Sequence, residues 1–255
     1  EVKALVDLAE SVGVPLAGGE RVDVNLTLDV RNETRTSWMP SPFSMPLTGV
    51  VSGVVRDVKP FDITVVQVQY SRQRPSHRVA LALQLAALEL SGGIHDWRAV
   101  LIDRGGRGAK KPSAVHLRLA GEFRERREGA VRLLVTALEL YLWALHDAVP
   151  LFDRASAALA NGDLDKAEGA LGDDLLDQWI AALWPGLSLE QLRLDPPMST
   201  DPEGLALFDT ITGGASRAEL VARWLWRTYH DVVIEGDDDA DSASGDDDPN
   251  DGGAE

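Results

Sequence analysis

The chain has 255 residues, with 41 acidic and 25 basic side chains, a formal net charge of −16 and no cysteine. The missing cysteines exclude disulfide scaffolds, cysteine-based zinc sites and thiol nucleophiles, and no apolar run reaches the roughly 18 residues of a membrane span. The chain begins with Glu1 rather than methionine and carries no signal-like segment. We therefore expect a piece of a longer, cytoplasmic protein, with one large domain or two small ones.

The first half of the chain is predicted to be a sheet around one central helix. Residues 1–12 are typical of the end of a helix, which Gly13 and Pro15 close. A nearly continuous apolar run over 78–90 predicts a buried helix, and a Pro-rich loop is expected over 38–46. Alternating and β-branched patterns predict strands over residues 21–30, 47–58, 62–70, 97–103 and 114–120.

The second half is predicted to be helical and to end in an acidic tail. Periodic apolar residues predict helices over residues 125–146, 151–160, 172–183 and 218–233. From Glu235 onward there are ten acidic residues and no basic one, so residues 235–255 are predicted to be disordered. Removing these ten charges leaves −6 for residues 1–234, which does not argue against a nucleic-acid ligand. We expect the end of a preceding helix and a linker over 1–19, and one domain over 20–234.

The sequence lacks the common nucleotide-binding and hydrolase motifs. The Gly-rich run over 105–112 does not have the spacing of a phosphate-binding loop. There is no G-x-S-x-G and no H-E-x-x-H, and the five histidines are scattered singly. We therefore expect no catalytic site, no metal site and no cofactor in this chain.

A predicted hairpin and buried helix over residues 47–90 resemble the core of the PD-(D/E)xK nuclease superfamily. In active members, two carboxylates hold Mg²⁺ and a lysine helps to activate water. The resemblance aligns Ser52 with the aspartate of the first strand, and Gln67 and Gln69 with the D-x-K motif, while Gln84 matches a family glutamine. It therefore implies an α/β fold with a degenerate nuclease core and a helical C-terminal half.

Residues 68–93 and 140–152, with the helix at 220–229, are similar to the C-terminal domain of RecC, the gamma chain of exodeoxyribonuclease V. The resemblance covers residues 20–234. It implies a non-catalytic region of a RecBCD-type complex that splits and channels DNA strands in double-strand break repair and recombination. RecB-like and RecD-like partner chains would use ATP and Mg²⁺, and the ligands would be double-strand DNA ends and separated single strands.

Basic residues cluster in two predicted loops, the first of which directly follows the degenerate strand. Such clusters can follow a phosphate backbone, but they can also be solvated loops whose arginines pair with carboxylates. The candidate DNA-binding residues are Arg72, Arg74 and Arg78 in the first loop, and Arg104, Arg107, Lys110 and Lys111 in the second. A third basic stretch over 118–132 is interrupted by glutamates and is predicted to be the salt-bridged start of a helix.

Two other functions stay open. One is a stand-alone Mg²⁺-dependent nuclease that uses the relocated carboxylates Asp57 and Asp62. The other is an interaction module that does not bind DNA. The ten acids of the tail also suggest a hypothesis about regulation, in which residues 235–255 compete with DNA for the basic loops.

Overall fold

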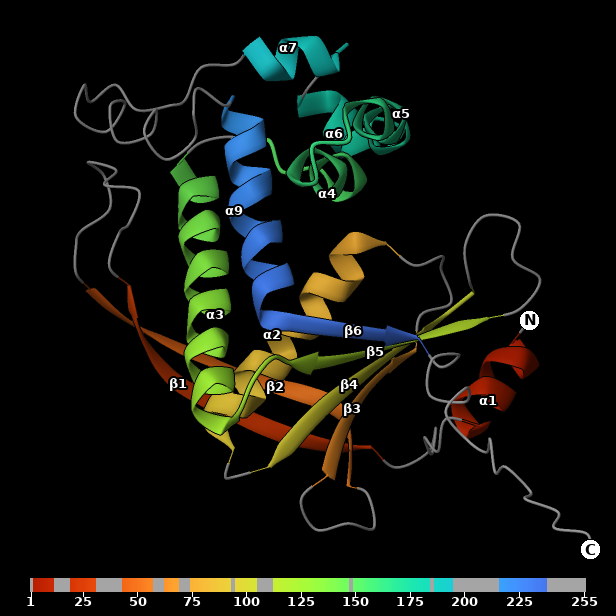
Figure 1. The fold of residues 1–255 in the computed structure, drawn as a ribbon, viewed down its shortest axis with the longest axis vertical. Helices are drawn as coiled ribbons and strands as arrows, with labels where there is room; N and C mark the ends of the chain where they lie inside the picture. The colour runs from red at the N-terminus through yellow and green to blue at the C-terminus, as the bar shows by residue number, and fades with distance from the viewer. Residues whose placement is uncertain are drawn as a thin grey trace, which may run out of the picture.

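A six-stranded sheet with helices on both faces forms the centre of the computed structural model (Figure 1). The structure describes residues 2–11, 19–30, 43–56, 62–68, 74–92, 95–104, 112–146, 149–183, 186–194 and 216–237. The strands are β1 (Glu20–Val30), β2 (Phe43–Arg56), β3 (Asp62–Val68), β4 (Asp96–Asp103), β5 (Ser113–Leu119) and β6 (Val233–Asp237). The helices are α1 (Val2–Ser11), α2 (Pro75–Ser91), α3 (Phe123–His146), α4 (Asp153–Ala160), α5 (Leu164–Asp174), α6 (Gln178–Leu183), α7 (Leu189–Leu194) and α9 (Arg217–Val232).

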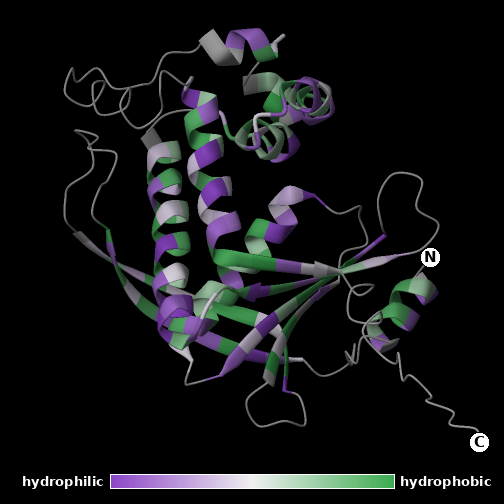
Figure 2. Cartoon of the chain, in the orientation of Figure 1, coloured by the Kyte–Doolittle hydropathy of each residue, from purple (hydrophilic) through white to green (hydrophobic). Residues whose placement is uncertain are grey.

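The strands follow the order of the chain across the sheet, from β1 to β6. Every neighbouring pair is antiparallel except β3 and β4, which are parallel because α2 returns the chain between them. Hydrophilic and hydrophobic residues alternate along the strands (Figure 2), so one face of the sheet packs its apolar side chains against α2, α3 and α9. The predicted mixed α/β class is confirmed.

Helix α2 is the central buried helix, and it extends the predicted range at both ends. Pro75 begins the helix, because its fixed φ suits the first helical position and its missing N–H would have no helical partner. Leu81, Leu85 and Leu88 are fully buried against the sheet. The helix ends before Gly92, where a Cβ atom would lie 2.7 Å from the Trp97 ring. The sheet therefore approaches this helix end too closely for a side chain.

Helix α1 packs on the opposite face of the sheet. Its buried residues Leu5 and Ala9 contact Val100, Ile102 and Ala114 of β4 and β5 in a small second apolar layer. The sequence predicts the end of a preceding helix and a linker over 1–19, outside the domain, whereas α1 packs against the sheet. Among the residues described above, no helix is both long enough and apolar enough to cross a membrane.

The hairpin of β1 and β2 is longer than predicted. Residues 43–46, which were assigned to the loop over 38–46, pair with β1, and Val30 lies opposite Phe43. A β-bulge interrupts the hairpin at Gly53. The φ of this residue is 79°, a backbone conformation that favours glycine. Because the bulge inserts one residue, the buried side chains change from odd to even positions between Val51 and Val54.

Strand β6 corrects the predicted start of the acidic tail. It pairs antiparallel with β5, so that Val233 lies opposite Leu119 and Asp237 lies opposite Val115. Residues 235–237 therefore belong to the sheet, because their main-chain groups pair with β5 even though two of their side chains are acidic. The rest of the predicted tail, residues 238–255, lies outside the described residues.

A helical cluster made by α4, α5, α7 and the start of α9 has an apolar core of its own. The helix predicted over 172–183 is wrong as one element, since α5 ends at Asp174 and α6 begins at Gln178. The buried Asp174 carboxylate accepts hydrogen bonds from the N–H groups of Arg154 and Ala155, at 2.9 and 3.0 Å. It thus caps the N-terminus of α4 from a different helix.

Replacing Asp174 by alanine is expected to lower the free energy of unfolding by about 1–3 kcal/mol, because two buried N–H groups lose their acceptor. The neighbouring Asp173 is the matched control, since it forms only a surface ion pair with Arg154 at 2.9 Å. Asp173→Ala is expected to cost less than about 1 kcal/mol. Urea denaturation of both variants measures the difference, and equal losses would show that the cap does not stabilise α4.

Candidate nucleic-acid interface

Arg78, a candidate DNA-binding residue, lies in the first turn of α2 and pairs with the last strand of the sheet. Its Nη1 donates to Oε2 of Glu235 at 2.6 Å, and the Tyr229 hydroxyl donates to Oε1 of the same carboxylate at 2.6 Å. Tyr229 is fully buried, and this burial, together with Glu235, raises the pKa of the phenol far above its ordinary value. The phenol therefore stays a donor, and Glu235 joins α2, α9 and β6.

Arg74, the residue before α2, is held more weakly. Its Nη1 lies 3.9 Å from Oδ2 of Asp153, the first residue of α4, and half of the Arg74 side chain is exposed. Asp153 also accepts a hydrogen bond from the Ser76 N–H at 2.7 Å and thereby caps α2. At 3.9 Å and with the arginine side chain half exposed, this ion pair contributes little to holding Arg74 in place.

The two predicted basic loops leave from the same end of the sheet. Strands β3 and β4 run parallel with Val68 beside Ile102, and Arg104 follows directly after β4. Strand β6 ends at this end too, since Asp237 lies opposite Val115 near the start of β5. Arg104 is exposed. Arg72, Arg107, Lys110 and Lys111 lie outside the described residues.

Two of the residues aligned with the nuclease site, Ser52 and Gln67, lie on opposite faces of the sheet. Ser52 is exposed and pairs with Arg21 of β1, on the face opposite to the buried Val51. Gln67 lies two residues after the buried Val65, so its side chain is on the same face of the sheet and points toward the helices. Its amide oxygen has no hydrogen-bond partner among the described residues. A metal ion needs ligands that converge, and these two side chains diverge.

Of the remaining candidate ligands, Gln84 and Asp62 belong to the described residues, and they lie on different elements. Gln84 is half-buried on α2 and lines an apolar cavity between the β1–β2 hairpin and α3. Gln69 and the alternative carboxylate Asp57 lie outside the described residues, and Asp62 is the first residue of β3, beside Asp96. Within the described ranges, no group of three histidine, aspartate or glutamate side chains is arranged to hold a metal ion.

The third basic stretch is the salt-bridged helix start that the sequence predicts. Arg124 pairs with Glu128 at 2.9 Å, and Arg126 lies 3.5 Å from Glu89 and 3.7 Å from Asp96. The buried Glu89 was missed, although one acid in an apolar helix was a visible signal. Burial raises the pKa of its carboxyl, and Arg126 acts in the opposite direction. Arg126 therefore holds α3 against α2 and β4, whereas the Arg124 pair lies within α3.

Residues 1–164, more than half of the chain, match the family model described as the RecC C-terminal domain. No curated protein and no solved structure matches the chain. The matched range contains the strands β1 to β5 and the helices α1 to α4. The similarity therefore extends over five of the six strands and over α1, α2 and α3, but not over α9 or β6.

Proposed function

The chain belongs to the RecC C-terminal domain family, and from this premise we propose that it splits and channels DNA strands and scaffolds the partner chains of a RecBCD-type complex. Family membership makes it a RecC-type subunit region of exodeoxyribonuclease V, and it implies partner subunits and a role in DNA repair and recombination. In the proposal, RecB-like and RecD-like chains carry ATP hydrolysis and Mg²⁺-dependent cleavage, and the complex works in the cytoplasm.

The parallel pairing of β3 and β4 is the observation that carries the DNA-binding part of this proposal. Because these two strands run in the same direction, both finish at the same end of the sheet. Each is followed by a basic loop, although the two loops are far apart in the sequence. Arg74 and Arg104 flank these loops and are exposed. A positive patch built from two loops would meet a phosphate backbone over several contacts.

A degenerate nuclease core is the proposed origin of the sheet. The antiparallel β2–β3 hairpin, followed by the buried α2, supports the resemblance to that superfamily. Ser52 and Gln67 are neutral and point to opposite faces, which is a poor basis for Mg²⁺ binding. We therefore assign no catalytic role to Ser52, Gln67, Gln69 or Gln84.

Affinity purification of the full-length parent protein tests the scaffold role. Stoichiometric recovery of two helicase-like chains, one of which carries an intact D-x-K nuclease, is the expected result. Recovery of the parent protein alone would refute the scaffold role.

Binding of a forked DNA duplex to the 255-residue chain is expected to weaken steeply with salt. Replacing Arg107, Lys110 and Lys111 together by alanine should reduce the slope of log K against log salt by about one for each lost phosphate contact. Arg124→Ala is the control, because this arginine forms an exposed ion pair with Glu128. Salt-insensitive or absent binding would favour an interaction module, whereas Mg²⁺-dependent cleavage that Asp62→Asn abolishes would favour a nuclease.

A further inference from the structure

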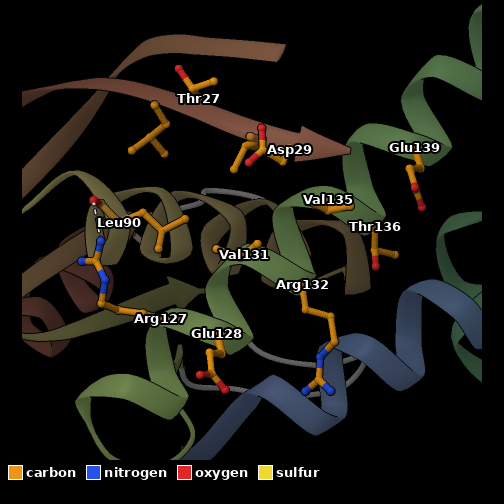
Figure 3. Close-up of a pocket in the computed structure, with 12 residues that line it drawn as sticks. Thr27, Asp29, Leu90, Arg127, Glu128, Val131, Arg132, Val135, Thr136 and Glu139 are labelled. Carbon is orange, nitrogen blue, oxygen red and sulfur yellow. Dashed lines mark hydrogen bonds between the residues drawn. The ribbon is translucent and has the colours of Figure 1, made fainter. Parts of the chain in front are cut away.

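A groove with a volume of about 610 Å³ lies between β1 and α3 (Figure 3). One wall consists of four consecutive β1 residues, Leu26 to Asp29, and the other is a face of α3 that includes Val131, Arg132 and Val135. Successive side chains of a strand point to opposite faces. A groove that touches four consecutive residues therefore runs along the edge of the strand, where the main-chain groups lie.

This edge of β1 is an open edge of the sheet. Strand β1 is the first in the strand order, and within the described part of the chain it pairs with β2 alone. Thr27 lies opposite Pro46 of β2. Since proline has no N–H, it fits where the main chain of β2 does not donate to β1, and the main-chain groups of Thr27 then point to the open edge. Two residues further on, those of Asp29 point the same way.

The side chains of the groove combine an apolar floor with one available positive charge. Leu26, Leu90, Val131 and Val135 supply the apolar surface. Arg127 is already engaged, because it donates to the main-chain carbonyls of Glu89 and Leu90. Glu128 pairs with Arg124, and Asp29 accepts a hydrogen bond from Ser44. Arg132 is exposed and forms no ion pair with any described residue of this chain.

We propose that this groove binds an extended peptide segment of a partner chain, which adds as a further strand to the edge of β1. The open main-chain groups select an extended conformation, and the apolar floor accepts every second side chain. Arg132, which forms no ion pair with a described residue, favours an acidic residue at one of the alternate positions. Four β1 residues span roughly 13 Å, so the contact involves about four to six peptide residues. The proposal goes beyond DNA binding and does not depend on it.

Selection from a displayed library of random twelve-residue peptides tests the proposal on the 255-residue chain. The enriched sequences are expected to alternate apolar and polar residues and to include an acid. When the best peptide binds, hydrogen exchange at the amides of Thr27 and Asp29 should slow down, because these amides become donors to the added strand. Of two peptides with a proline at either of two adjacent central positions, one should lose binding, since alternate residues of an added strand donate to β1.

Two pairs of variants show whether the peptide occupies this groove. Val131→Glu and Arg132→Glu are each expected to weaken the selected peptide at least about tenfold, as changes at the centre of an interface do. Leu145→Glu and Arg223→Glu are the matched controls, since Leu145 is an exposed apolar residue of α3 outside the groove and Arg223 is an exposed arginine of α9. These controls should bind the peptide as the unchanged chain does.

Three results would overturn the proposal. The first is that the library yields no peptide that binds the unchanged chain more tightly than it binds Val131→Glu. The second is a single-stranded oligonucleotide that displaces the selected peptide and loses affinity in Val131→Glu, because the groove would then serve nucleic acid. The third is a dimer in sedimentation velocity that Val131→Glu dissociates, because the edge of β1 would then pair with a second copy of the chain.

Discussion

Replacing Arg126 by methionine is expected to lower the free energy of unfolding by about 3–5 kcal/mol, because it leaves a buried carboxylate without its counter-charge. Only 1% of Glu89 is exposed, and the Arg126 guanidinium lies 3.5 Å from its Oε1 atom. Methionine retains the length and apolar contacts of the arginine stem, so the change removes the charge and the polar contacts of the guanidinium with Glu89, Asp96 and the His95 carbonyl. Urea denaturation followed by circular dichroism measures the loss.

Two further variants separate the buried pair from ordinary surface pairs. The double variant Arg126→Met with Glu89→Met should recover most of the loss, because apolar residues of similar volume replace a buried ion pair at little cost. Arg124→Met removes an exposed pair with Glu128 and is expected to change stability by less than about 1 kcal/mol. If Arg124→Met and Arg126→Met had equal effects, Glu89 would not depend on Arg126.

The same pair gives stability a defined pH dependence. Burial raises the pKa of Glu89 above its ordinary value, so the unfolded chain loses this proton at lower pH than the folded chain does. The contribution of Glu89 to stability is therefore largest below the ordinary pKa, about 4.3, and falls as the pH rises to the folded pKa. Arg126→Met removes the opposing charge, so the fall should continue to higher pH. Glu89→Gln should abolish this dependence of stability on pH.

Ending the chain at Ile234 is expected to lower the free energy of unfolding by at least about 1–3 kcal/mol, the cost of a buried polar group without a partner. This truncation removes Glu235, which accepts hydrogen bonds from the buried Tyr229 hydroxyl and from Arg78. It also removes the strand pairing of residues 235–237. Thermal unfolding of the truncated chain measures the loss.

Ending the chain at Asp237 is the matched control for this truncation, because it removes eight of the ten acidic residues of the predicted tail and retains all of β6. It should leave stability within about 0.5 kcal/mol of the unchanged chain. This shorter deletion is also the proper test of competition between the acidic residues and DNA. If DNA affinity at low salt is the same with and without residues 238–255, that hypothesis fails.

Strong local patterns predicted most of the fold. The alternation of β1 and the apolar run of α2 gave those elements to within a few residues, because each is set by its own side chains. Strand β6 was missed because its residues are mainly polar or acidic and its pairing with β5 depends on distant parts of the chain. The bulge at Gly53 was missed for a similar reason, since it is a property of two paired strands.

The candidate site was predictable in composition but not in geometry. Its basic residues were visible in the sequence, yet the parallel register of β3 and β4 was needed to bring the starts of the two loops together. The partner of Arg78 could not be foreseen, because Glu235 had been assigned to a disordered tail and the pairing requires β6. Likewise, the edge groove exists only where β1 and α3 meet.

The position of β6 in the sheet determines the order in which the fold can be completed. Leu119 of β5 pairs with Val233 of β6, so more than a hundred residues must be synthesised after β5 before its partner exists. At ordinary rates of translation this takes on the order of ten seconds. During that interval the outer edge of β5, a strand with buried Val115 and Leu117, has no partner strand. Nascent chains at this stage are the ones that we expect to aggregate or to need a chaperone.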